Sequence, residues 1–400
     1  MLPLEHVTIL DLSRVLAGPF ASMILAELGA TVIKVEQPGV GDETRGFEPF
    51  VQRGDARESA YFFACNRSKQ SITVNLRSPD GQAVIRDLAG RADVFIENFP
   101  VGTMQRYGLH YEALRARNER IVYLSCTGFG QTGPYAQKKG YDTVFQAMGG
   151  MMSLTGERDG GPVKPGLPIA DLTSGLWVAI AILAMLTGRA HADRGAYVDF
   201  SMMDGQVSLL TLAAARYFAL GEVPPRLGTE HPGRVPSATF RCADGAFVHI
   251  TASDQHWLPL CQLLGIEQWG KASAFADNSS RVRSREIVMA GLSAAIAILT
   301  RDDLCAACDA AGVPAGPIKA VDEVLADPHT LARSMVSAFE HPRIGSFPFL
   351  ASPFKLDGWE NPVSSHPPVL GEHTEAVLAS RLGYSNERIA ALRAAKAIGD

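Results

Sequence analysis

One aspartate, Asp171, lies in the segment GLPIADLTSG, directly before a strongly apolar stretch. Aspartate is a favoured N-cap residue, so local sequence alone favours a structural role at the start of a helix. The same position also suits chemistry, because a helix N-terminus would keep the carboxylate ionised among apolar neighbours. An ionised, poorly solvated carboxylate is a usable nucleophile. Local sequence leaves both interpretations open.

A nucleophile at Asp171 needs backbone donors for a developing oxyanion, and Gly149-Gly150 or another glycine-containing loop could supply them. The segment Leu16-Ala17-Gly18-Pro19 lies between an expected strand and an expected helix. Its N–H groups at the helix start could hold a phosphate or an acyl oxygen. A plain connecting turn explains this segment equally well.

Two further loop motifs suggest phosphate chemistry. Gly128, Gly130 and Gly133 satisfy the GxGxxG pattern after a strand, and Glu36 ends the second expected strand, where a ribose-binding acid usually lies. A dinucleotide fingerprint should open a helix, whereas the residues after Gly133 read as a loop. Lys138-Lys139 is either a solvated basic turn or a clamp for phosphate or pyrophosphate.

The elements that must position these residues alternate between short β-branched strands and helices. This alternation predicts an α/β fold with an open, mostly parallel, doubly wound sheet, which binds ligands in the loops at the carboxyl ends of its strands. The expected strands are 7–11, 31–36, 72–75, 94–97, 121–125 and 197–200, and the expected helices are 20–28, 79–89, 111–117, 171–187 and 205–220.

The pattern changes after residue 220. A stretch rich in proline, glycine and charge is followed by a hairpin at 238–251 with its turn at 243–245, and then by helices to about residue 312. We therefore expect a large ligand-binding α/β domain at 1–220, a linker and smaller α+β domain at 221–334, and a C-terminal segment at 335–400 that returns to the large domain.

Composition excludes several classes. The chain has 400 residues, 46% of them hydrophobic and 20% charged, and its 37 basic against 42 acidic residues argue against a nucleic-acid partner. Six dispersed cysteines, including the Cys305–Cys308 pair, indicate reduced thiols without a metal. The N-terminus lacks a signal pattern, and the longest apolar run, 176–186, is short for a membrane span. We expect a cytoplasmic protein with no membrane partner.

The motifs together resemble the class III CoA-transferases, the family of formyl-CoA transferase, carnitine CoA-transferase and α-methylacyl-CoA racemase. The stretches that carry the resemblance span nearly the whole chain and include LSRVLAGPFA, SKQSITVNLRSPDG, ENFPVGTMQRYGL, GFGQTGPYAQKKGYD, IADLTSG and PPVLGEHT. The resemblance implies that Asp171 is the nucleophile, that the substrates are an acyl-CoA and a small carboxylic acid, and that no metal takes part. It also implies an interlocked homodimer, in which each chain threads through a ring made by the other.

Matching motifs imply which positions contact coenzyme A. The adenine end is expected near Val74, Asn75, Leu76 and Arg77, and the thioester end near Lys139, Tyr141 and Asp142. Further implied contacts are Leu16, Ala17, Asn98, Arg106 and Met202. Gln37 stands where formyl-CoA transferase has a cationic contact with coenzyme A.

Departures from the family pattern narrow the activity. Tyr141 replaces the histidine of the racemases, which removes one partner of their acid/base pair and favours a transferase. Thr251–Gln255 is bulkier than the glycine-rich flap of formyl-CoA transferase, which argues against formate and oxalate. The closest resemblance is to the branch of succinate–hydroxymethylglutarate CoA-transferase, which suggests dicarboxylates, and Arg14 is our candidate for binding a distal carboxylate. A racemase or epimerase and an inactive CoA-binding homologue remain the alternatives.

Overall fold

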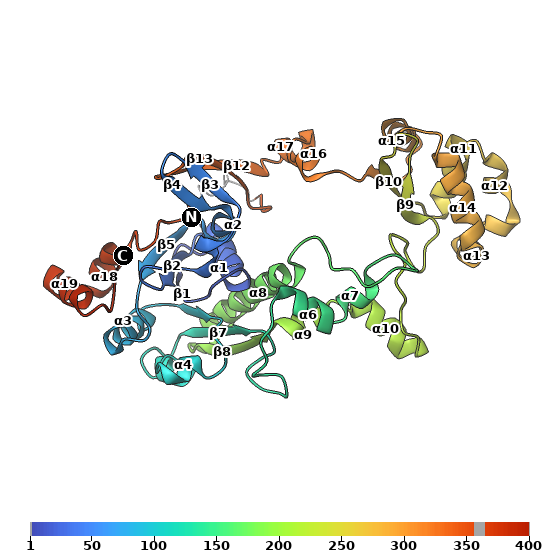
Figure 1. Ribbon diagram of the computed structural model, residues 1–400. Coiled ribbons are helices and arrows are strands. Elements are labelled where there is room, and N and C mark those ends of the chain that lie inside the picture. The colour runs from blue at the N-terminus through green and yellow to red at the C-terminus, as the bar shows by residue number, and fades with distance from the viewer. Residues whose placement is uncertain (1, 356–364, 400) are drawn as a thin grey trace. The chain divides into compact units, whose positions relative to one another are not determined.

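A computed structural model describes residues 2–355 and 365–399 of the chain. The chain forms two compact units (Figure 1). The large unit comprises Met1–Met151, Pro165–Ala214 and Leu331–Asp400, and the small unit comprises Met152–Lys164 and Ala215–Thr330. We describe each unit by itself.

The large unit is built on one six-stranded parallel sheet, which confirms the predicted fold class. The strand order is β5-β2-β1-β6-β7-β8. The order therefore reverses direction between β1 and β6, and loops that leave such a switch point diverge and open a crevice for ligands. The strands are β1 (Thr8–Asp11), β2 (Thr31–Glu36), β5 (Lys69–Thr73), β6 (Val94–Glu97), β7 (Val122–Thr127) and β8 (Ala196–Ser201).

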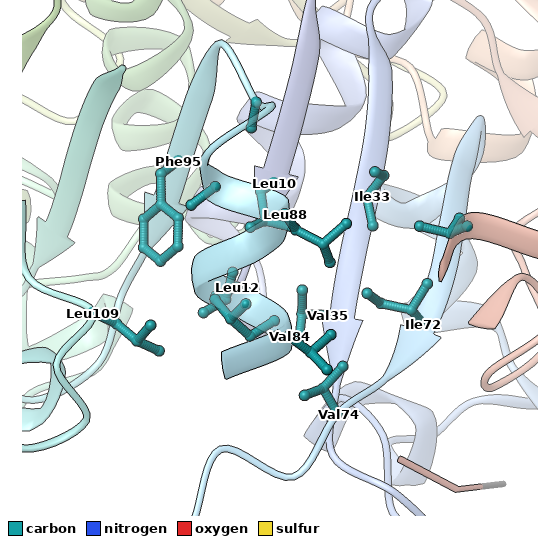
Figure 2. Close-up of a cluster of buried hydrophobic side chains, with 14 of the residues drawn as sticks. Leu10, Leu12, Ile33, Val35, Ile72, Val74, Val84, Leu88, Phe95 and Leu109 are labelled. Carbon is teal, nitrogen blue, oxygen red and sulfur yellow. The ribbon is translucent and has the colours of Figure 1, made fainter. Parts of the chain in front are cut away.

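Helices cover both faces of this sheet. On one face α1 (Ala17–Glu27) and α8 (Ile169–Ala192) share an apolar core with the strands. On the other face the core joins α3 (Pro79–Ala89) to α18 (Thr374–Leu382) and α19 (Asn386–Ala394). Figure 2 shows Val84 and Leu88 of α3 against Leu10, Ile33 and Ile72 of three neighbouring strands. Residues from the C-terminal segment thus complete the core of the large unit.

The segment between β2 and β5 holds structure that the sequence patterns did not reveal. It contains a short 3₁₀ helix at Glu43–Gly46, the hairpin of β3 (Phe50–Arg53) and β4 (Ala56–Ser59), and the helix α2 (Ala60–Asn66). A second hairpin, β12 (Val336–His341) with β13 (Gly345–Leu350), packs aromatic residues against Phe62 and Phe63 of α2.

The other helices before residue 221 are α4 (Thr103–Arg106), α5 (Tyr111–Arg115), α6 (Asp142–Met148), α7 (Met151–Leu154), α9 (Met202–Ser208) and α10 (Thr211–Leu220). The single helix expected at 205–220 is therefore two helices.

Helix α8 is longer than expected at both ends. It has 24 residues and begins at Ile169, with Pro168 at the N-cap, so Asp171 is its third residue and does not cap it. By length and composition α8 could cross a membrane, and one third of its most apolar window is buried. Val178, Ala179 and Ile182 pack into the core under the sheet, as in a core helix.

The small unit contains an antiparallel sheet and a helical layer around a core that includes Trp257, Leu260 and Leu292. The expected hairpin is present as β9 (Ser237–Arg241) and β10 (Phe247–Thr251), and β11 (Ala315–Pro317) pairs with β10. The helices are α11 (Asp254–Leu263), α12 (Glu267–Lys271), a 3₁₀ turn at Ser273–Phe275, α13 (Asn278–Arg283), α14 (Arg285–Ile296), α15 (Arg301–Ala310), α16 (Val321–Leu325) and α17 (Pro328–Ala332).

Two glycines of α8 allow a direct test of the packing between α1 and α8. A Cβ at Gly175 would lie 2.8 Å from the Ala17 carbonyl oxygen of α1, whereas a Cβ at Gly188 would meet nothing within 4 Å. We expect Gly175→Ala to lower the free energy of unfolding by about 1–3 kcal/mol, since overpacking forces the helices apart. Gly188→Ala should raise it by up to about 1 kcal/mol, since alanine favours a helix interior. Equal effects of the two substitutions on urea unfolding would contradict this packing.

Candidate active site

Two carboxylates with different roles meet at the first turn of α8. Asp142, the first residue of α6, accepts hydrogen bonds through Oδ1 from the backbone N–H groups of Ala170 (2.9 Å) and Asp171 (3.1 Å). The capping role that local sequence suggested for Asp171 therefore belongs to Asp142. Gln146, one turn along α6 and fully buried, donates to the other carboxylate oxygen of Asp142 and fixes its orientation.

The Asp171 carboxylate is left without those amide donors. Burial, followed by the negative charge of Asp142, raises the pKa of Asp171 from its ordinary 3.8 to about 7. The expectation that the helix terminus would hold Asp171 firmly ionised was wrong, because Asp142 already accepts the free amides. Near neutral pH the carboxyl group therefore exchanges readily between a neutral and an anionic form, and the anion is poorly stabilised by its surroundings.

Tyr61, which sequence reasoning did not select, belongs to the same site. It lies on α2, and its ring meets the Phe47 ring edge-on with centroids 5.5 Å apart. Burial and then the charge of Asp171 raise the pKa of Tyr61 to about 12, so the phenol keeps its proton and can donate a hydrogen bond beside the carboxylate. The only sequence signal was a run of three aromatic residues, Tyr61–Phe63, at the start of an unpredicted helix.

Leu16 and Ala17, which were expected to face the acyl group, stand at the start of α1, next to α8. The Ala17 carbonyl is in contact range of Gly175, which stands one turn after Asp171 on the same face of α8. Val15, in the loop before α1, has φ of 71°, a costly conformation for a β-branched residue. The Val15 N–H points to both oxygens of Asp42, at 3.3 Å each.

Two buried lysine–aspartate pairs fix the backbone of this loop. The Lys34 ammonium contacts Asp42 at 2.8 Å and donates to the Ser13 carbonyl at 3.0 Å. The Lys69 ammonium pairs with Asp11 at 3.4 Å and donates to the Pro19 carbonyl at 2.8 Å. All four charged side chains are fully buried, so each needs its partner. The two lysines thereby fix the backbone at both ends of the loop.

A cavity of about 560 Å³ opens at the carboxyl ends of β1, β2 and β5, next to the switch point of the sheet. It is lined by the whole segment expected at the adenine end, namely Val74, Asn75, Leu76 and Arg77, and also by Gln37. Arg14 lines it too, where its guanidinium pairs with Glu43 at 2.7 Å and lies 4.7 Å from the centre of the Phe99 ring.

The remaining predicted residues fall into two groups. Tyr141, at the N-cap of α6, is 75% exposed and adjoins Asp142, and Lys139 is exposed in the loop before it. Met202 is buried at the start of α9, a helix tied to α8 by a hydrogen bond from Gln206 to Thr173.

Asn98 and Arg106 have structural contacts of their own. The Asn98 amide makes two hydrogen bonds with the backbone of Arg14, accepting from its N–H at 2.9 Å and donating to its carbonyl at 2.8 Å. Asn98 therefore joins the loops that follow β1 and β6. Arg106, which is exposed, donates to the buried Thr103 hydroxyl at 3.1 Å within α4.

The glycine-rich loop after β7 has a packing role. A Cβ on Gly128 or on Gly140 would collide with the Phe145 ring, at 2.5 and 2.6 Å respectively, so this ring sits between two glycines. Glu36, which marked the ribose position, is held by Arg45 at 2.6 Å and by the Ser71 hydroxyl at 2.6 Å. These contacts give Gly128 and Glu36 structural roles that need no dinucleotide.

The described residues offer no ligand set for a metal ion. Across residues 2–355 and 365–399, no three His, Cys, Asp or Glu side chains converge in a way that could hold a metal ion. Cys308 is buried, Cys305 is partly exposed, and both are free thiols.

Comparisons with known proteins agree on one family. The family model described as CoA-transferase family III matches residues 4–374. Succinate–glutarate CoA-transferase of Agrobacterium fabrum is 39% identical over 380 residues, covering 94% of this chain and 95% of that protein. Succinyl-CoA:glutarate CoA-transferase of Mus musculus is 38% identical over 391 residues, covering 97% and 88%. The crystal structure of a CaiB/BaiF family protein from Brucella suis matches with a TM-score of 0.84 and 41% identity, covering 94% and 98% of the two chains.

The raised pKa of Asp171 predicts a pH-dependent effect of Asp171→Asn on stability. Between pH 4 and 7 the folded protein keeps a proton on Asp171 that the unfolded chain has lost, so wild-type stability falls as pH rises through this window. Asp171→Asn removes this loss, which is at most roughly 1.4 kcal/mol per pH unit of the window. The variant should therefore gain stability over wild type from pH 4 to 7 in urea unfolding.

The matched control is Asp159→Asn, which changes an exposed loop aspartate. Its stability relative to wild type should not vary over the same pH range. If the free energies of unfolding of wild type and Asp171→Asn differed by the same amount at every pH, the Asp171 carboxyl group would have an ordinary pKa.

Proposed function

The chain belongs to CoA-transferase family III, and from that membership we propose that it moves coenzyme A from a dicarboxylyl-CoA to a free carboxylic acid through a covalent intermediate on Asp171. The observation that carries the proposal is the carboxylate pair at the start of α8, where Asp142 accepts the amides and leaves Asp171 poorly solvated. A poorly stabilised carboxylate anion is a good oxygen nucleophile.

The first half of the reaction loads coenzyme A onto the enzyme. The Asp171 carboxylate attacks the thioester carbonyl of the donor, a mixed anhydride forms, and coenzyme A leaves as a thiolate. The thiolate then attacks the aspartyl carbonyl, which gives an aspartyl-CoA thioester and frees the donor acid as its carboxylate. The exposed phenol of Tyr141 and the protonated phenol of Tyr61 are suited to donate to the oxyanions that arise.

The second half repeats these steps with the acceptor acid. Its carboxylate attacks the aspartyl thioester, the thiolate leaves, and a new mixed anhydride forms. The thiolate then attacks the acceptor carbonyl, which releases the new acyl-CoA and restores the Asp171 carboxylate. Two easier exchanges thus replace one difficult exchange. The adenine end of coenzyme A would lie in the 560 Å³ cavity along Val74–Arg77.

The test is a matrix of CoA donors against free acids, with the thioester products followed by mass. We expect succinyl-CoA and glutarate to yield glutaryl-CoA and succinate. Asp171→Asn should lower this rate by three or more orders of magnitude while it still binds coenzyme A, because the amide cannot act as the nucleophile. Transfer by Asp171→Asn at the wild-type rate would exclude the covalent route, and α-deuterium exchange without an acceptor acid would favour the racemase.

Dicarboxylates are the substrate class that we propose. The curated relatives named above act, by their names, on succinate or succinyl-CoA and on glutarate. We propose Arg14 as the cation for the distal carboxylate, with Glu43 as the partner that would have to release or share it. The planar guanidinium suits bidentate recognition of a carboxylate.

Arg14→Ala is expected to act selectively. It should raise the KM for succinyl-CoA by about tenfold, the effect of losing one charged hydrogen bond, and should change the KM for a monoacyl-CoA much less. Steady-state kinetics with both donors measure the difference. Equal losses for both donors would show that Arg14 does not bind the distal carboxylate.

We also propose that the protein works as an interlocked homodimer in the cytoplasm. Large apolar side chains are exposed on the outer face of α8, at Leu176, Trp177 and Ile180, and on α10, at Leu212 and Phe218. Exposed apolar side chains that gather on one helix face favour burial against another protein surface, and a second copy of the chain would supply one.

A further inference from the structure

The C-terminal residues reach the cavity that holds the proposed adenine site. Ile398 forms an antiparallel bridge with Val74, and the Asn75 N–H donates to the Ala397 carbonyl at 2.8 Å. Ala397 and Ile398 are buried in the core. The segment 396–399 thus pairs with the chain just beyond β5 through one isolated bridge, and Lys396 lines the cavity.

Lys396 has a backbone conformation that its side chain does not favour. Its φ is 56°, in the left-handed region. It stands just past the C-cap of α19, where its N–H bonds to the Arg393 carbonyl and the next N–H bonds to the Leu392 carbonyl, both at 2.9 Å. This pair of bonds defines a Schellman motif, and glycine is the residue usually found at that position. A lysine there costs backbone strain, which indicates that its side chain has a use.

The charges around the cavity point to that use. Each acid that lines it is already paired: Glu43 with Arg14, Asp42 with Lys34, and Glu36 with Arg45. Two lining cations are left, Arg77 and Lys396, and neither side chain forms an ion pair or hydrogen bond with any residue that the structure describes. The cavity rim therefore has an excess of positive charge beside the expected adenine segment.

We propose that Lys396 binds a phosphate group of the coenzyme A nucleotide, so that the C-terminal tail completes the nucleotide end of the site. This inference rests on the proposed function. A flexible ammonium with three donors suits a phosphate oxygen. The Asn75 side chain donates to the Lys396 backbone carbonyl at 3.2 Å, which anchors the tail at this position.

Glycine substitution separates the side chain from the fold. Lys396→Gly removes the ammonium and relieves the left-handed backbone, so its thermal midpoint should equal or exceed that of wild type. Its Kd for coenzyme A, measured by calorimetry, should rise about tenfold, as expected for one charge-assisted hydrogen bond. Lys396→Arg should keep most of the affinity.

Arg393→Ala is the matched control, because Arg393 lies in the last turn of α19, three residues before Lys396, pairs with Glu375 at 2.6 Å and does not line the cavity. It should leave the Kd unchanged. If the loss of affinity in Lys396→Gly disappears when dephospho-CoA replaces coenzyme A, the partner of Lys396 is the 3′-phosphate. If the loss persists, the partner is the pyrophosphate. Unchanged affinity of Lys396→Gly, or an equal loss in Arg393→Ala, overturns the inference. Failure of wild type to bind coenzyme A would instead refute the proposed function.

Discussion

The Asp142 carboxylate at the amino terminus of α8 is the interaction on which the site depends. A helix terminus offers a limited number of free amides, and Asp142 accepts those of Ala170 and Asp171 from a helix 29 residues earlier in the chain. One contact therefore joins α6 to α8, fixes where α8 begins and denies Asp171 the same stabilisation. The result is two neighbouring carboxylates with different environments, and the less stabilised one is free to react.

A second constraint holds the loop before α1 against α8. The two buried lysine–aspartate pairs are costly to desolvate, and a hydrophobic cluster of equal volume would stabilise the fold as well or better. These pairs instead orient the backbone. Lys34 and Lys69 also donate hydrogen bonds to the Ser13 and Pro19 carbonyls, and so hold a strained loop against Gly175 of α8. The sheet sets the positions of the strands, and these buried charges set the position of the loop at its switch point.

Local patterns predicted most of the frame, because parallel strands buried on both faces must be apolar and β-branched. They missed the cap of α8, since a carboxylate that arrives from a distant loop leaves no trace beside the helix it caps. They also missed Tyr61, whose chemistry comes only from its proximity to Asp171. Asn98 was selected by motif as a contact with coenzyme A, and in the fold its amide holds the Arg14 backbone. Such roles depend on tertiary neighbours, which spacing along the chain does not specify.

The central claim is that Asp171 carries coenzyme A during turnover, and trapping tests it most directly. The protein would be incubated with succinyl-CoA, quenched with hydroxylamine, digested and mapped by mass spectrometry. An activated aspartyl carbonyl reacts to give a hydroxamate, so the account predicts that modification on the peptide containing Asp171, only when the acyl-CoA is present. An enzyme that turns over normally but carries the hydroxamate on another residue, or on none, would contradict the account.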